Sequence, residues 1–169
     1  MRVILQPHPA SPPSPVEQIV VYFERVNRFR FWAQFELRGE LSQVVWPASV
    51  LGGRADDLWR TTCFEAFLRG EDAYWEFNFS PSRQWASYSF DAYRSGQRQA
   101  AEVASPGQLE LEESYAELEV TFEQPPGVTH LGLSAVIQTI NGATSYWALA
   151  HPLDKPDFHH PDSFVLDLP

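Results

Sequence analysis

Residues 28–38, which read RFRFWAQFELR, alternate apolar and polar side chains along almost their whole length. This period of two is typical of a β-strand with one buried face, because successive side chains of a strand point to opposite sides of the sheet. Two other long segments, residues 115–123 and 129–140, alternate in the same way. Shorter segments with strand character are residues 18–23, 41–46, 61–68, 74–79, 85–93, 108–112, 146–150 and 163–168.

Turn-forming residues separate these segments, and Asn141-Gly142 is the strongest of them because Asn-Gly readily takes the positive φ angles of a tight hairpin. Helical character is weak and confined to residues 58–66 and 93–104. The pattern predicts an all-β fold with about ten strands, little helix and two antiparallel sheets packed as a jelly-roll-like β-sandwich. We expect one domain over residues 1–169, with residues 1–16 as a proline-rich, extended N-terminal strap.

The composition excludes several classes of function. Of the 169 residues, 44% are hydrophobic and 20% are charged, and the net charge is −10. This acidity argues against binding to nucleic acid or to anionic membranes, both of which need clustered cations. A single cysteine, Cys63, excludes a disulfide framework, a cysteine-based zinc site and an iron–sulfur cluster. No signal peptide or long apolar run is visible, so a cytoplasmic location is expected.

Aromatic and polar side chains are densest between residues 59 and 93. Residues 74–79 and 85–93 predict a hairpin that places Glu76 and Asn78 beside Ser87 and Ser89. Carboxylate and amide groups bordered by aromatic rings suit a sugar, because rings stack on its C–H face while polar groups hold its hydroxyls. The alternative is the plain solvent-facing side of a sandwich. The candidate ligand-binding residues are Trp59, Glu65, Tyr74, Glu76, Asn78, Trp85, Asp91, Tyr93 and Trp147.

Enzymatic and metal-binding interpretations have weaker support. Glu65 with Glu76 or Asp91 would make a glycosidase carboxylate pair, but with 22 acidic residues such pairs are common. No nucleophile elbow, P-loop or dinucleotide-binding motif is present, and Cys63 is expected to be a buried, inert thiol. The segment 155–162 carries His159 and His160 with two aspartates, in a spacing that favours a hydrogen-bonding loop over a metal site. We therefore expect no enzyme.

Several motifs together resemble the bacterial DOMON-like domain proteins. They are DLWRTTCFEAFL at 57–68, YWEFNFSP at 74–81, WASY at 85–88, FDAYR at 90–94, YWAL at 146–149 and HP…KPDFH at 151–159. The resemblance runs from Pro7-His8-Pro9 to Phe164, nearly the whole chain. It implies the β-sandwich shared by DOMON domains and family 9 carbohydrate-binding modules.

Relatives in this wider group bind either sugars or haem. The haem-binding pattern typically uses a methionine with a histidine or lysine, and here the only methionine is Met1. Haem would therefore need two histidine ligands, or one histidine with Lys155. The candidate histidines are His130, His151, His159 and His160. The function expected first is a non-enzymatic module for a saccharide or similar polar molecule. The alternatives are a haem-binding domain with histidine ligation, and a protein-interaction domain that docks a partner or a second copy.

Overall fold

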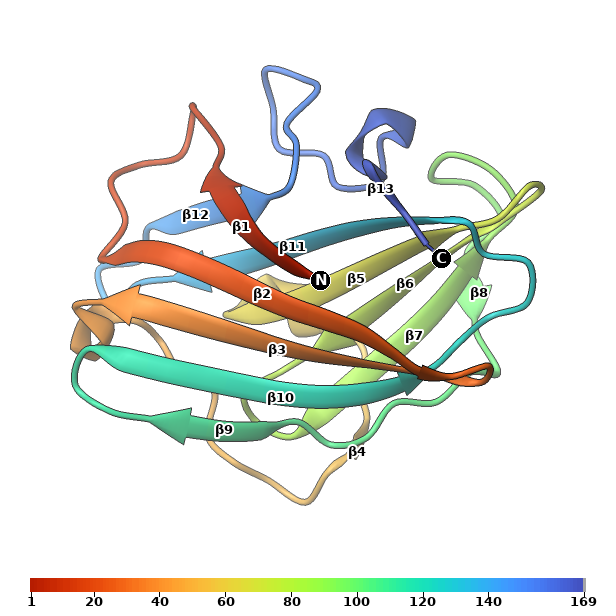
Figure 1. Cartoon of the computed structure of the whole chain (residues 1–169). Helices are drawn as coiled ribbons and strands as arrows, with labels where there is room; N and C mark the ends of the chain where they lie inside the picture. Colours follow the sequence, from red (N-terminus) through yellow and green to blue (C-terminus); the bar gives the residue numbers. More distant parts are fainter. Residues whose placement is uncertain (169) are drawn as a thin grey trace.

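The computed structural model describes residues 1–168, and within them the chain forms thirteen strands and three short 3-10 turns (Figure 1). The strands are β1 (Arg2–Pro7), β2 (Val16–Asn27), β3 (Arg30–Gly39), β4 (Gly53–Arg54), β5 (Cys63–Arg69), β6 (Tyr74–Phe79), β7 (Gln84–Phe90), β8 (Arg98–Gln99), β9 (Gln108–Leu111), β10 (Tyr115–Glu123), β11 (His130–Gln138), β12 (Thr144–Ala148) and β13 (Leu166–Asp167). The turns are η1 (Leu41–Gln43), η2 (Leu58–Arg60) and η3 (Pro161–Ser163). The expectation of an all-β fold with little helix is confirmed.

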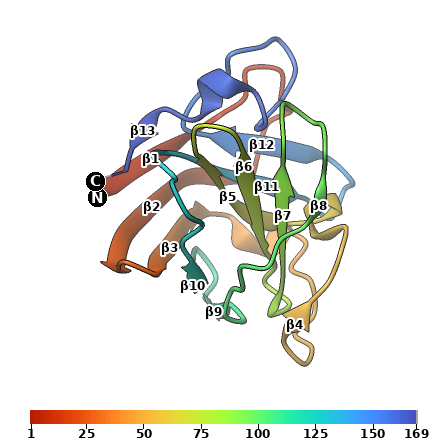
Figure 2. The same ribbon diagram turned by 90° about the vertical axis from the view of Figure 1, so that its right-hand side faces the viewer.

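The strands form one strongly curled sheet in the order β4-β7-β6-β5-β11-β12-β1-β2-β3-β10-β9, with β13 paired to β11 and β8 to β7. Neighbours are antiparallel except β4 and β7. The expected sandwich of two separate sheets is wrong, because β1 belongs to both halves. Its first residues pair with β2 through Ile4 and Val20, and its last pair with β12 through Gln6 and Ala148. The sheet therefore bends at β1 and folds back on itself (Figures 1 and 2).

The main core lies between the two halves of this curled sheet. The apolar positions of the opening stretch in β3, among them Phe31 and Phe35, are fully buried, as the alternation predicts. Phe35 meets Phe64 of β5 with ring centroids 5.1 Å apart, and Phe122 of β10 meets Phe77 of β6 at 4.8 Å. These aromatic contacts join β3 and β10 in one half of the sheet to β5 and β6 in the other half. They set which face of β5 and β6 is turned inward.

Three segments differ from their sequence predictions. Residues 41–46 are not a strand but begin with η1, where the Trp46 indole N–H donates to the Leu41 carbonyl at 3.1 Å. Residues 93–104 contain β8 in place of a helix, after a turn in which Gly96 has a φ of +69°. The proline-rich opening is divided into strand β1 and a loop over residues 8–15. None of the helical turns in residues 1–168 is long and apolar enough to cross a membrane.

The outer face of β5, β6 and β7 carries a second, smaller apolar cluster. Phe67, Tyr74 and Phe90 pack there against Phe164 and Phe158 from the segment that follows β12. This C-terminal segment, defined here as residues 149–164, crosses the outside of the sheet above these strands (Figure 1). The C-terminal segment therefore forms a roof over this outer face, and the candidate site lies beneath it.

Candidate functional site

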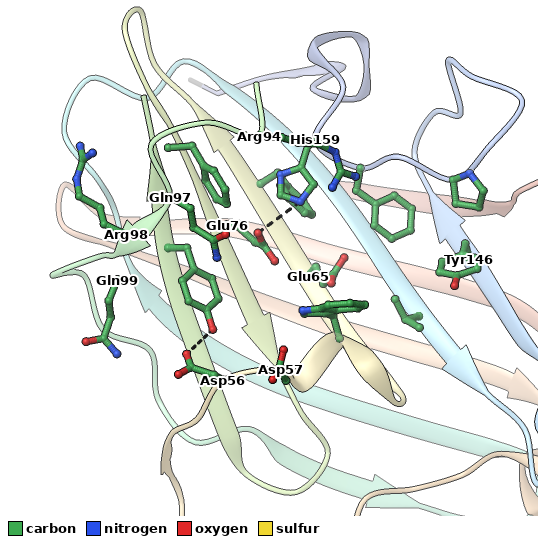
Figure 3. A pocket seen from close by; sticks show the side chains of 17 residues that line it. Asp56, Asp57, Glu65, Glu76, Arg94, Gln97, Arg98, Gln99, Tyr146 and His159 are labelled. Carbon is green, nitrogen blue, oxygen red and sulfur yellow. Dashed lines mark hydrogen bonds and ion pairs between the residues drawn. The ribbon is translucent and has the colours of Figure 1, made fainter. Parts of the chain in front are cut away.

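A cavity of about 930 Å³ lies on the outer face of β5, β6 and β7, between η2, the chain from β7 to β8 and the C-terminal segment (Figure 3). Aromatic rings and charged or amide groups share its wall. The aromatic members are Trp59, Phe67, Tyr88, Phe90, Tyr146 and Phe158. The charged, amide and imidazole members are Asp56, Asp57, Glu65, Glu76, Arg94, Gln97, Arg98, Gln99 and His159.

The pairing of β6 with β7 decides which side chains enter the cavity. Glu76 lies opposite Tyr88, and Ser87 lies opposite Phe77 on the core side. The predicted placement of Ser87 and Ser89 beside Glu76 is therefore wrong by one residue. A slip of one residue moves every side chain of a strand to the other face. The cavity consequently gains the Tyr88 and Phe90 rings in place of two serines.

Two buried carboxyl groups form the floor of the cavity. Glu65 of β5 is 3% exposed and accepts a hydrogen bond from the Ser134 hydroxyl at 2.8 Å. Glu76 of β6 is 6% exposed and accepts from the Asn78 amide at 2.7 Å. Asn78 lies directly opposite Glu65 in the ladder, so the two glutamates are diagonal neighbours on one face.

Burial makes both carboxyl groups hold their protons more tightly. Burial, and then repulsion from Glu76, raises the pKa of Glu65 to about 8, against the lowering effect of Ser134. Burial also raises the pKa of Glu76, although Asn78 and Arg94 oppose the shift. At neutral pH the floor is therefore partly protonated, and it can both donate and accept hydrogen bonds.

The side chain of His159 extends from the C-terminal segment into the cavity. Its ring packs 5.2 Å from both the Phe67 and Phe90 rings, and its Nδ1 lies 2.9 Å from the Tyr74 hydroxyl. Its Nε2 lies 3.6 Å from a carboxyl oxygen of Glu76 (Figure 3). Burial, assisted by the positive charge of Arg94, lowers the pKa of His159 to about 4, so the imidazole is neutral at neutral pH.

Asp157 anchors the same segment to the loop after β7. Its carboxylate accepts from the Arg94 guanidinium at 2.9 Å, from the Tyr93 hydroxyl and from the backbone N–H of His159 at 3.1 Å. The Asp157 carbonyl accepts from Ser163 at 3.1 Å. One side chain thus ties the roof of the cavity to its wall.

Replacing Asp157 by alanine should loosen the roof, because three hydrogen bonds are lost and Arg94 is left without its acid partner. We expect a loss of about 1–3 kcal/mol in unfolding free energy and faster hydrogen exchange at backbone amides of residues 155–164. The control is Asp162→Ala in the same segment, whose side chain is 80% exposed. Equal exchange in both variants would show that Asp157 is not the anchor.

The rim is organised around Trp59 of η2, which is 47% exposed. The Arg60 guanidinium lies 4.8 Å from the Trp59 ring centroid and is paired with Asp57 at 3.1 Å. Asp56 accepts a hydrogen bond from the Tyr88 hydroxyl at 2.6 Å (Figure 3). These contacts position one accessible indole and one phenol at the mouth of the cavity.

The structure brings together only some of the sequence-predicted site residues. Trp59, Glu65 and Glu76 line the cavity, while Asn78 and Tyr74 support it from behind through Glu76 and His159. Among the residues missed by sequence reasoning are Tyr88, Arg94 and Asp56. For Tyr88 the hairpin register would have been the signal, whereas no local pattern marks the other two.

Four predicted residues lie elsewhere. Trp85 and Trp147, 8% and 3% exposed, belong to the main core on the opposite face of the sheet. Asp91 pairs with Arg98 at 2.6 Å, and Tyr93 donates to Asp157. Neither Asp91 nor Tyr93 lines the cavity. Alternation marks a tryptophan as facing one side of a strand but does not say which side is the core.

The four candidate histidines do not come together in the cavity. His159 is the one histidine among the lining residues, and its ring is enclosed by aromatic side chains. His151 lies near the Gln6 carbonyl at 2.8 Å, and His130 and His160 lie near Asp167 and Asp162 at 3.4 and 3.9 Å. Within residues 1–168, no three His, Cys, Asp or Glu side chains are arranged to hold a metal ion. The residues present do not fit histidine-ligated haem in the cavity.

Comparison with known proteins gives a likeness of fold. No protein-family model matches the chain, and no curated protein matches it. Among solved structures, the chain is similar to the crystal structure of a "putative carbohydrate-binding protein" from Bacteroides uniformis ATCC 8492. The TM-score is 0.61 and the identity 16%, over 95% of this chain and 83% of the other. The two proteins therefore share a β-rich fold.

Proposed function

We propose that the protein is a non-enzymatic binding module for a saccharide or a similar polar small molecule, which it takes into the cavity above β5, β6 and β7. The observation that carries the proposal is the joining of accessible rings, Trp59 and Tyr88, to buried carboxyl groups, Glu65 and Glu76, in one wall. The volume of about 930 Å³ lies in the usual range for small-molecule sites.

Each part of the wall has a role that suits a sugar. Trp59 at the mouth offers a flat apolar face on which a sugar ring can stack. The carboxyl groups below and the amides of Gln97 and Gln99 offer donors and acceptors for hydroxyl groups. Asp157 holds the roof in place, so the cavity is pre-formed and little ordering is needed on binding.

Two likenesses support this proposal. The Bacteroides protein is described as a "putative carbohydrate-binding protein", and its fold is shared over most of both chains. The sequence motifs resemble DOMON-like domain proteins, and we propose membership of that wider group. Because a shared fold does not fix function, the proposal rests on the residues of the cavity, and the two likenesses are secondary support for it.

The first test is thermal unfolding of the protein against a panel of neutral and charged oligosaccharides, followed by calorimetric titration of those that stabilise it. A ligand at about 100 times its dissociation constant adds about 2.7 kcal/mol of stability, which raises the melting temperature by about 5–10 °C for a chain of this size. A panel in which no saccharide shifts the melting temperature would contradict the proposed function.

Trp59→Ala is expected to weaken saccharide binding by about tenfold to a hundredfold, because the stacking face at the mouth of the cavity is lost. The matched control is Trp32→Ala, which removes a half-buried tryptophan of β3 that does not line the cavity. Unchanged affinity in Trp59→Ala would place the ligand outside this cavity.

A further inference from the structure

The charges that line the cavity are unbalanced. Its two arginines are already paired with acids that do not line it, Arg94 with Asp157 at 2.9 Å and Arg98 with Asp91 at 2.6 Å. Glu65 and Glu76 on the floor have no arginine or lysine within 4.0 Å among the described residues. Neither carboxyl group on the floor is therefore paired directly with an arginine or a lysine.

One carboxyl oxygen of Glu65 is left open to a ligand. The other oxygen accepts from Ser134, and no second hydrogen bond to Glu65 forms within residues 1–168. Glu65 is nevertheless almost wholly buried and borders the cavity. On Glu76, one oxygen accepts from Asn78 and the other lies 3.6 Å from the His159 imidazole, beyond a normal hydrogen bond.

The groups that face this pair come from several neighbouring elements. Around the glutamates lie Cys63 of β5, Asn78 and Tyr74 of β6, Tyr88 of β7, Ser134 of β11, and Arg94 and His159 from the loops. Arg94 is the one charged member of this set at neutral pH. Its guanidinium pairs with Asp157 and with neither glutamate, although its charge still lowers the pKa of Glu76.

A buried carboxyl group without a counter-charge is costly and is normally paired or protonated. The raised pKa values show that retained protons offset this cost here. A positively charged ligand group also offsets it, because diagonal neighbours on one sheet face are about 7–8 Å apart and one cation between them can contact both carboxyl groups. Tyr88 lines the same cavity, and an aromatic ring whose face meets the cation adds attraction.

We propose that the ligand is an amino saccharide whose protonated amine lies beside Glu65 and Glu76. This inference rests on the proposed saccharide function and narrows it to a chemical class. The ammonium donates to the open oxygen of Glu65 and to the Glu76 carboxylate. The carboxyl proton that it replaces leaves to solvent, so binding releases a proton while the amine keeps its own.

The test uses three trisaccharides of β-1,4-linked glucose units that differ only at C2: cellotriose with hydroxyl groups, the chitin trisaccharide with acetamido groups, and the chitosan trisaccharide with free amines. Titrations are carried out below the pKa of the amine, in two buffers of different ionisation enthalpy. We expect the chitosan trisaccharide to bind at least tenfold more tightly than the other two, and the buffer dependence to report proton release.

Glu65→Gln keeps the shape of the side chain and should reduce this preference to less than about threefold. Glu76→Gln is the second variant, and Glu110→Gln on the exposed strand β9 is the matched control for the change in net charge. The control should retain the full preference.

The outcomes separate this inference from the proposed function. Equal binding of all three trisaccharides, or tighter binding of a neutral one, overturns the amine assignment and leaves saccharide binding in place. Preference for the amine that survives in both glutamine variants also overturns it, since the cation would then sit elsewhere. If no saccharide of this set or of the wider panel binds, the proposed function fails as well.

Discussion

Replacing Trp85 by alanine is expected to lower the free energy of unfolding by about 3–5 kcal/mol. Although sequence reasoning places Trp85 at the ligand site, its side chain lies in the main core, where it is 8% exposed. The Arg54 guanidinium lies 4.5 Å from its ring centroid and donates from there to the carbonyls of Ser87 and Ala100. Truncation leaves a cavity and removes the surface against which Arg54 packs.

Chemical denaturation and melting of the two tryptophan variants check this expectation. Trp85→Ala should melt about 6–20 °C below the wild-type protein, whereas Trp59→Ala at the exposed rim should change stability by less than about 1 kcal/mol. The two variants thus separate stability from binding. A Trp85→Ala protein of normal stability that had lost saccharide binding would restore the sequence-based assignment and contradict the structure.

The wild-type protein is expected to lose about 2 kcal/mol of stability relative to Glu65→Gln as the pH rises from 6 to 8. Burial raises the folded-state pKa of Glu65 to about 8, from 4.5 for an exposed carboxyl group. Between these values the folded protein binds a proton that the unfolded chain has released. Its contribution to stability is therefore complete below pH 4.5 and is lost as the pH rises through about 8.

Melting curves of both proteins at several pH values measure this difference. Titrating groups that do not interact with Glu65 cancel in the comparison, including His159, whose lowered pKa makes the fold less stable as the pH falls from 6.5 towards 4. Glu110→Gln serves again as the control and should follow the wild-type curve. Parallel curves for wild type and Glu65→Gln would mean that Glu65 ionises normally and is not desolvated.

The strands were largely predictable, because alternation depends only on which faces are buried. Residues 115–123 and 74–79 coincide with β10 and β6, and the buried positions of β3 follow the predicted face. Strand β1 was missed because the prolines beyond it mask a short pairing segment. That omission has a large consequence, since β1 is the strand that joins the two halves into one sheet.

Site residues were predictable only where the sequence of a single strand marks them. Glu65 and Glu76 stand out as acidic residues among apolar neighbours, and both are found on the cavity floor. Trp85 was misplaced because the register of β6 and β7 depends on how the turn between them closes, where Ser80 donates to the Gln84 carbonyl. A register shift of one residue turns the other face of β7 towards the cavity, so that two aromatic rings line it where two serines were predicted.

By itself, the sequence of this protein determined the β class, most of the strands and the alternate burial along them, because these follow from local periodicity and turn chemistry. Only the tertiary structure decided that the sheet curls through β1, which face of β7 enters the cavity, and that the C-terminal segment roofs it through Asp157 and His159. The physical reason is that these features depend on contacts between residues far apart in the chain, such as Glu76 with His159, which no local pattern encodes.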